Sequence, residues 1–148
     1  MALNAIDRID DIAHVIQLAV APVFLLTAVG TLLAVLTNRL GRSVDRRRVL
    51  AAYLLTVDAP LAREAREELD TVERRVHLIY GAIALAVICA IFVCLLISAA
   101  FVGAFVATEL SRVLGVLFVL AMLALIGSLG IFLREIFLAV SGPRSAIR

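Results

Sequence analysis

The chain has 148 residues, of which 64% are hydrophobic and 18% charged, and its mean hydropathy is +1.10. An ordinary soluble domain contains about 45–50% apolar residues, so this composition excludes a simple water-soluble globule. The net charge of +2 comes from 14 arginines without any lysine, set against 12 carboxylates, and it indicates no nucleic-acid-binding surface. One domain, covering residues 1–148, is expected at this length.

Three apolar stretches predict membrane-spanning helices. The first, residues 15–37, contains no charged residue, and at 1.5 Å per residue it is about 34 Å long, which crosses a hydrocarbon core of about 30 Å. The second predicted span, residues 78–106, is longer than a bilayer requires, so we expect it to tilt or to extend beyond the lipid. The third covers residues 113–133 and follows a short turn at one membrane face.

The arginines predict the orientation of these spans. Twelve of them lie in the connection at residues 38–77 or in the tail at residues 134–148, and only Arg8 and Arg112 lie on the other side. Because basic residues concentrate on the cytoplasmic side of a membrane, we expect the connection and the tail in the cytoplasm and the N-terminus outside.

The connection between the first two spans is predicted to form two helical arms. It is too polar to enter the membrane, and it contains no Gly/Ser/Pro-rich tract typical of a flexible linker. Residues 38–53 continue the first span, and residues 61–77 lead into the second, with apolar residues at steps of three and four. The predicted fold is therefore all-α: an integral membrane protein with three transmembrane helices, of which the first two extend into a cytoplasmic antiparallel helical hairpin.

Polar residues form a stripe along the first helix. Its polar members recur at steps of three, four or seven residues, counted through the apolar Phe24, and so share one side of the helix: Asp7, Asp10, His14, Gln17, Thr31 and Asn38. If several copies assemble with this stripe inward, the acidic residues form rings at an entrance, as in cation channels. The alternative is a solvated interfacial helix, followed by polar residues that make ordinary hydrogen bonds. Pro22 lies in the same helix and predicts a local bend or hinge.

Charged residues of the two arms face each other in the antiparallel register. The expected distance from the membrane is similar for the arginines of the first arm, Arg46, Arg47 and Arg48, and the glutamates of the second, Glu64, Glu67 and Glu68. We favour ion pairs within or between subunits, and the alternatives are contact with anionic headgroups, a partner or a phosphorylated ligand. Beyond the third span, Arg134 and Glu135 mark the inner interface, where Arg134 is expected to reach toward water and Glu135 to find a partner.

The sequence meets no enzyme template. It lacks a Gly-rich phosphate loop, a Ser/His/Asp set and a Cys/His metal pattern, so we expect neither catalytic residues nor a cofactor. Asp7, Asp11 and His14 lie one turn apart, but a single histidine with carboxylates is a weak metal signal, and no metal site is predicted.

Three strings resemble the bacterial DUF2721 family of small membrane proteins. They are IQLAVAPVFLLTAVGTLLAVLTNRLGRSVDRRR at residues 16–48, ERRVHLIYGAI at residues 73–83 and FLREIFLA at residues 132–139. The resemblance covers nearly the whole chain and implies a three-span protein of the bacterial inner, or plasma, membrane. It supplies no established activity or ligand.

These observations lead to two hypotheses about function. The first is a homo-oligomeric inner-membrane protein that forms an ion channel or pore, with the first helix lining the axis. The second is a structural or accessory membrane protein that binds a cytoplasmic partner or lipid through its charged hairpin. The expected partners are membrane lipid, further copies of the chain and ions, but not nucleic acid.

Overall fold

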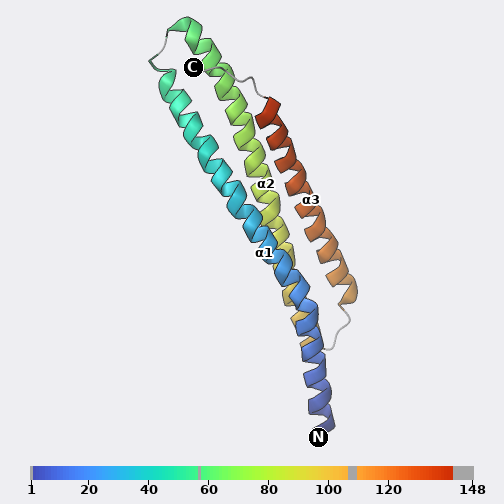
Figure 1. Ribbon diagram of the computed structural model, residues 1–148. Helices are drawn as coiled ribbons and strands as arrows, with labels where there is room; N and C mark the ends of the chain where they lie inside the picture. The colour runs from blue at the N-terminus through green and yellow to red at the C-terminus, as the bar shows by residue number, and fades with distance from the viewer. Residues whose placement is uncertain (1, 57, 107–109, 142–148) are drawn as a thin grey trace. The chain divides into compact units, whose positions relative to one another are not determined.

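The computed structural model describes residues 2–56, 58–106 and 110–141, and in these residues it contains three α-helices and no strand (Figure 1). They are α1 (Ala2–Tyr53), α2 (Ala59–Val106) and α3 (Ser111–Ser141). Side chains are described for residues 20–56, 58, 61–103 and 110–140. The protein is thus all-helical in the described part.

All three helices are long and apolar enough to cross a membrane. The candidate stretches are Val20–Tyr53, Leu61–Gly103 and Ser111–Val140. Large apolar side chains remain on the outside of each helix, among them Phe24 and Phe137, which are 71% and 62% exposed. Such surfaces are costly in water but suited to lipid, so the helices are consistent with a multi-pass membrane protein.

The chain reverses direction between α1 and α2. Helix α1 ends at Tyr53, whose carbonyl accepts hydrogen bonds from both the backbone N–H and the hydroxyl of Thr56, each at 3.0 Å. The first turn of α2 is fixed by a bond from the Ala62 N–H to the Asp58 carbonyl, and Pro60 occupies this turn, where its missing N–H costs nothing. The predicted arms at residues 38–53 and 61–77 both lie within helices.

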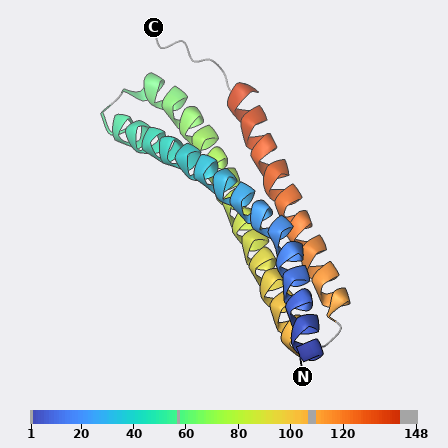
Figure 2. The same ribbon diagram turned by 60° about the horizontal axis from the view of Figure 1, so that its bottom comes forward.

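The described residues divide into two compact units, and one consists of residues 33–85 with the chain from residue 127 onward. In this unit the ends of α1 and α2 that flank the turn lie side by side and antiparallel (Figure 2). Their contact is a core of Leu50, Val72 and Val76, with partly buried leucines and valines around it. Helix α3 joins this unit through Ser128, whose hydroxyl donates to the Ala82 carbonyl at 2.7 Å.

The other unit comprises residues up to 32 and residues 86–126. Small side chains dominate its interior, because Ala86 and Cys89 of α2 and Ala121 of α3 are completely buried. Small residues allow helices to approach closely, which is how helices associate in lipid. Cys89 and Cys94 are both free thiols, and Cys94 is exposed.

Helix α3 continues past the predicted end of the third span. The sequence placed the end of that span at residue 133 and a tail from residue 134, and the helix runs on to Ser141, so the first part of the tail is helical. The helix continues because Glu135 packs against the other helices. Its side chain is completely buried, and two arginines of the other helices compensate its charge.

Helix α1 runs through Pro22 as one helix, and Pro22 is buried. The bend or hinge expected there stays a prediction.

Candidate functional site

A single buried carboxylate connects α3 to both other helices. Glu135 Oε1 accepts hydrogen bonds from Nε and Nη2 of Arg75 on α2, at 3.1 and 2.9 Å. Glu135 Oε2 lies 3.2 Å from Nη2 of Arg39 on α1. The side chain of Glu135 is 0% exposed, whereas those of Arg39 and Arg75 are 25% and 27% exposed. We call these three residues the carboxylate clamp.

The two arginines of the clamp hold Glu135 differently. Arg75 donates two hydrogen bonds, which is the strong charge-assisted arrangement. Arg39 approaches Oε2 without hydrogen-bond geometry, and this oxygen has no hydrogen-bond partner among the described residues. Arg39 also lies over the ring of Phe132, 5.3 Å from its centroid, which is within the range of a cation–π contact. Arg39 is therefore positioned by two separate contacts with α3.

In the sequence, all three residues lie close to the ends of the apolar stretches. Arg39 follows the first apolar stretch, Arg75 precedes the second and Glu135 follows the third, all on the arginine-rich side of the predicted spans. Sequence reasoning expected a partner for Glu135 but did not name one. The signal that would have found both arginines is their closeness to the ends of apolar stretches, because helix ends on one membrane face lie at a similar level.

The arms of the hairpin are joined by one ion pair between α1 and α2. Arg46 donates from Nε and Nη2 to Glu68 Oε1, at 2.9 and 2.6 Å. Glu67 instead lies 3.8 Å from Arg63, four residues earlier on the same helix. Arg47, Arg48 and Glu64 are exposed and form no ion pair within the described part of the chain. The structure thus brings together two of the six charged residues that the sequence singled out on the arms.

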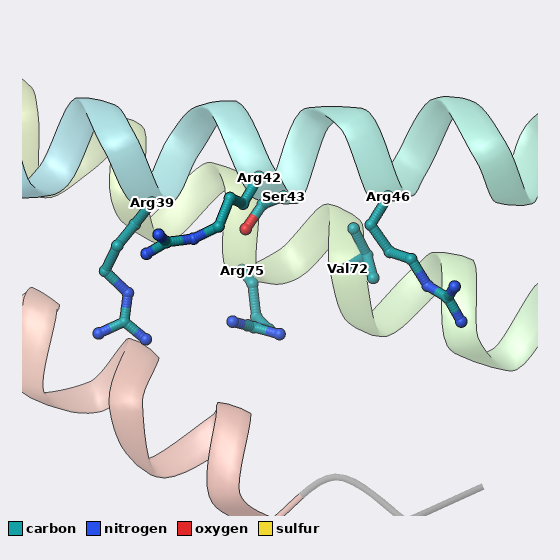
Figure 3. A pocket seen from close by; sticks show the side chains of 6 residues that line it. All are labelled: Arg39, Arg42, Ser43, Arg46, Val72 and Arg75. Carbon is teal, nitrogen blue, oxygen red and sulfur yellow. The ribbon is translucent and has the colours of Figure 1, made fainter. Parts of the chain in front are cut away.

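A basic pocket lies between the clamp and this ion pair. Its volume is about 180 Å³, and Figure 3 shows the six side chains that line it: Arg39, Arg42, Ser43 and Arg46 from α1, and Val72 and Arg75 from α2. Arg42 forms no ion pair with any carboxylate of the described residues. Four arginine side chains therefore line one pocket, and sequence reasoning did not predict it. The i, i+3, i+4 and i+7 spacing of the four α1 residues is the signal that places them on one face.

The polar stripe of α1 is described only in part. Asp7, Asp10, His14 and Gln17 belong to the helix, but their side chains lie outside the described residues. Thr31 is exposed, and its hydroxyl donates to the Thr27 carbonyl of the same helix at 3.1 Å. Asn38 is exposed as well.

Arg134 is exposed on α3, next to the buried Glu135. Within the described residues, no group of three metal-ligating side chains lies close enough together to hold an ion.

The fold and the site define an all-helical protein with three helices of membrane-spanning length and a buried ion-pair cluster that joins them. A model of the DUF2721 family, described as a protein of unknown function, matches residues 19–144, which include the clamp and the whole pocket. The chain belongs to this family. No curated protein and no solved structure matches it.

Proposed function

We propose that the protein is a structural or accessory protein of a membrane, with three spanning helices, and that its hairpin at residues 38–77 binds anionic lipid headgroups on the cytoplasmic side. The observation that carries this proposal is the carboxylate clamp. Because Glu135 ties both arms of the hairpin to α3, the arms form a preformed charged surface and do not behave as a flexible linker.

Two features support the location of the hairpin. The arms hold nine of the 14 arginines, which is the bias expected of a cytoplasmic segment next to spanning helices. Arg47 and Arg48 are exposed and form no ion pair within the described residues, so their charges are available to the membrane surface. An arginine close to an anionic surface contributes about 1 kcal/mol to binding.

The orientation is tested by labelling single cysteines from one side of the membrane. In a Cys89→Ala/Cys94→Ala background, Leu55→Cys marks the turn of the hairpin, where Leu55 is 88% exposed, and Ser111→Cys marks the start of α3. In spheroplasts, a membrane-impermeant maleimide is expected to label only the cysteine at position 111, and after lysis both. Labelling of position 55 in intact spheroplasts would contradict the cytoplasmic hairpin.

The lipid preference is tested by the melting temperature in nanodiscs of phosphatidylglycerol compared with phosphatidylcholine. We expect a higher melting temperature in the anionic lipid, because bound headgroups stabilise the folded state. Arg47→Glu/Arg48→Glu is expected to remove this difference. Arg47→Lys/Arg48→Lys keeps the two charges and is the matched control, which should retain it. An unchanged difference in the reversed variant would overturn the proposal.

A second candidate function is an ion-conducting homo-oligomer whose α1 helices line the axis. The observation in its favour is that Thr31 and Asn38 are exposed on α1, so these polar side chains are available to another subunit. Under this proposal Asp10→Asn changes cation selectivity in a liposome flux assay, and Thr31→Leu blocks flux without dissociating the oligomer. Unchanged flux in both variants would remove the candidate.

A further inference from the structure

The basic pocket contains more positive charge than its neighbours neutralise. Its four arginines meet two carboxylates: Arg39 and Arg75 share Glu135, and Arg46 pairs with Glu68. Arg42 adds a further positive charge without a carboxylate partner in the described part of the chain. Four positive against two negative groups leave a surplus of two positive charges around one small pocket, which favours occupation by an anion.

The arginines also keep hydrogen-bond donors that their protein partners do not use. A guanidinium carries five N–H donors, and Arg75 and Arg46 each direct Nε and Nη2 at a single carboxylate oxygen. Arg39 approaches Glu135 without forming a hydrogen bond to the oxygen it faces. The pocket therefore combines surplus charge with unused planar donors, and the side chain of Ser43, which is 9% exposed, forms part of its wall.

We propose that this pocket binds one phosphate group. Arginine matches phosphate because its planar donors contact two oxygens at once, and a phosphate group carries the one or two negative charges that offset the surplus. The volume of about 180 Å³ leaves room for a tetrahedral anion. The inference deepens the proposed function, on which it rests only for the position of the pocket at a lipid surface.

The phosphate could belong to a lipid headgroup or to a small soluble phosphate. Arg39 and Arg42 follow the apolar stretch of residues 15–37 within five positions, so in a membrane the pocket lies at the level of the headgroups. The pocket is open to solvent as well, because Arg42 is exposed. The same arginine chemistry serves both sources, and the experiment separates them.

The test uses the full chain, purified in a neutral maltoside detergent without phosphate. Inorganic phosphate is titrated against chloride at constant ionic strength, and binding is measured by calorimetry. In a second arm, phosphatidylglycerol is added to the micelles, and native mass spectrometry records how many lipids remain bound. Arg42→Gln removes a pocket arginine that forms no ion pair in the described structure. Arg66→Gln is the matched control, because Arg66 is exposed on the neighbouring arm and does not line the pocket.

We expect Arg42→Gln to weaken binding about tenfold or more, and Arg66→Gln to change it less than about twofold. If this difference appears with inorganic phosphate, the ligand is a soluble phosphate; if it appears only with phosphatidylglycerol, the ligand is a lipid. Either result supports the pocket. Equal effects of the two variants would show that the probes bind by general attraction to positive charge and not in the pocket. Absence of binding by either probe would show that the protein has no phosphate site. Both results overturn the inference.

These outcomes are distinguishable from a failure of the proposed function. Phosphate affinity in detergent does not depend on which side of a membrane the hairpin occupies. Conversely, the nanodisc comparison changes only Arg47 and Arg48 and leaves Arg42 in place in every variant. A protein that prefers anionic nanodiscs but shows no effect of Arg42→Gln would keep the proposed function and lose the phosphate pocket.

Discussion

At the scale of single residues, Glu135 is the side chain of α3 that contacts arginines of both other helices. Glu135→Gln keeps the shape but removes the charge that compensates Arg39 and Arg75. Removal of one member of a buried ion pair lowers the free energy of unfolding by about 3–5 kcal/mol. Because both arginines are partly exposed, we expect a smaller decrease of about 2–3 kcal/mol. The free energy of unfolding, measured by circular dichroism during titration of the micelles with dodecyl sulfate, checks this value.

Arg134→Gln supplies the control for the clamp, because Arg134 is the exposed neighbour of Glu135 on the same helix. We expect a change of less than about 0.5 kcal/mol. Equal losses in the two variants would mean that the clamp contributes no more to stability than a surface charge.

Ser128 makes the other buried polar contact that joins α3 to α2. Its side chain is 0% exposed and donates to the Ala82 carbonyl at 2.7 Å. Ser128→Ala is expected to lower the free energy of unfolding by about 0.5–1 kcal/mol, the usual value for one hydrogen bond between helices in a membrane. Ser98→Ala is the matched control, because Ser98 is exposed and donates to the Cys94 carbonyl of its own helix. A loss in the control as large as in Ser128→Ala would contradict the interhelical role.

At the scale of the elements, the hairpin depends on the small core between its arms. Leu50 is 5% exposed and packs with Val72 and Val76. Leu50→Ala leaves a cavity, and we expect a loss of about 2–3 kcal/mol, concentrated in faster amide hydrogen exchange of residues 38–77. Leu55→Ala removes the same atoms from a side chain that is 88% exposed, and its exchange should stay unchanged. Uniformly faster exchange along all three helices would show that the hairpin does not open as a separate element.

Gly127 lies where α3 comes close to a side chain of α2. A Cβ added at Gly127 would lie 2.9 Å from Leu85 Cδ1, whereas one added at Gly130 meets nothing within 4 Å. Gly130→Ala should stabilise the protein by about 0.5–1 kcal/mol, because alanine restricts the unfolded chain and favours the helix. Gly127→Ala should stabilise the protein less than Gly130→Ala does, or destabilise it, because the side chain of Leu85 must move to make room for the added methyl group. The same unfolding titration compares the two variants, and an equal gain in both would exclude close packing at Gly127.

At the scale of the whole molecule, the ion-conducting candidate requires that copies of the chain contact each other through the exposed face of α1. Thr31→Cys places a thiol on that face, and Leu36→Cys places one at a completely buried position of the same helix. In a Cys89→Ala/Cys94→Ala background, a short bifunctional maleimide is expected to join copies through position 31 and not through position 36. The native mass in nanodiscs then gives the number of copies. A monomeric mass without crosslinks would remove the ion-conducting candidate.

Most of the helical layout could be read from the sequence. The apolar stretches at residues 15–37, 78–106 and 113–133 lie inside α1, α2 and α3, and the turn that follows Tyr53 falls between the predicted arms at residues 38–53 and 61–77. Membership in the DUF2721 family, expected from three strings of sequence, is confirmed over residues 19–144. Helix α3 continues to Ser141, past the predicted end of the third span at residue 133, and the bounds of the span itself stay a prediction.

By itself, the sequence determined which stretches are helical and which are apolar enough to span a membrane, since hydrophobic length, periodicity and turn residues act over a few neighbouring positions. Only the tertiary structure decided the partners of Glu135 and the lining of the basic pocket. Arg75 and Glu135 are 60 positions apart, and their contact depends on which face each helix turns toward the others and on the register between them. These quantities arise from the packing of whole helices, in which a step of one residue turns a side chain by about 100°, so no local pattern fixes them.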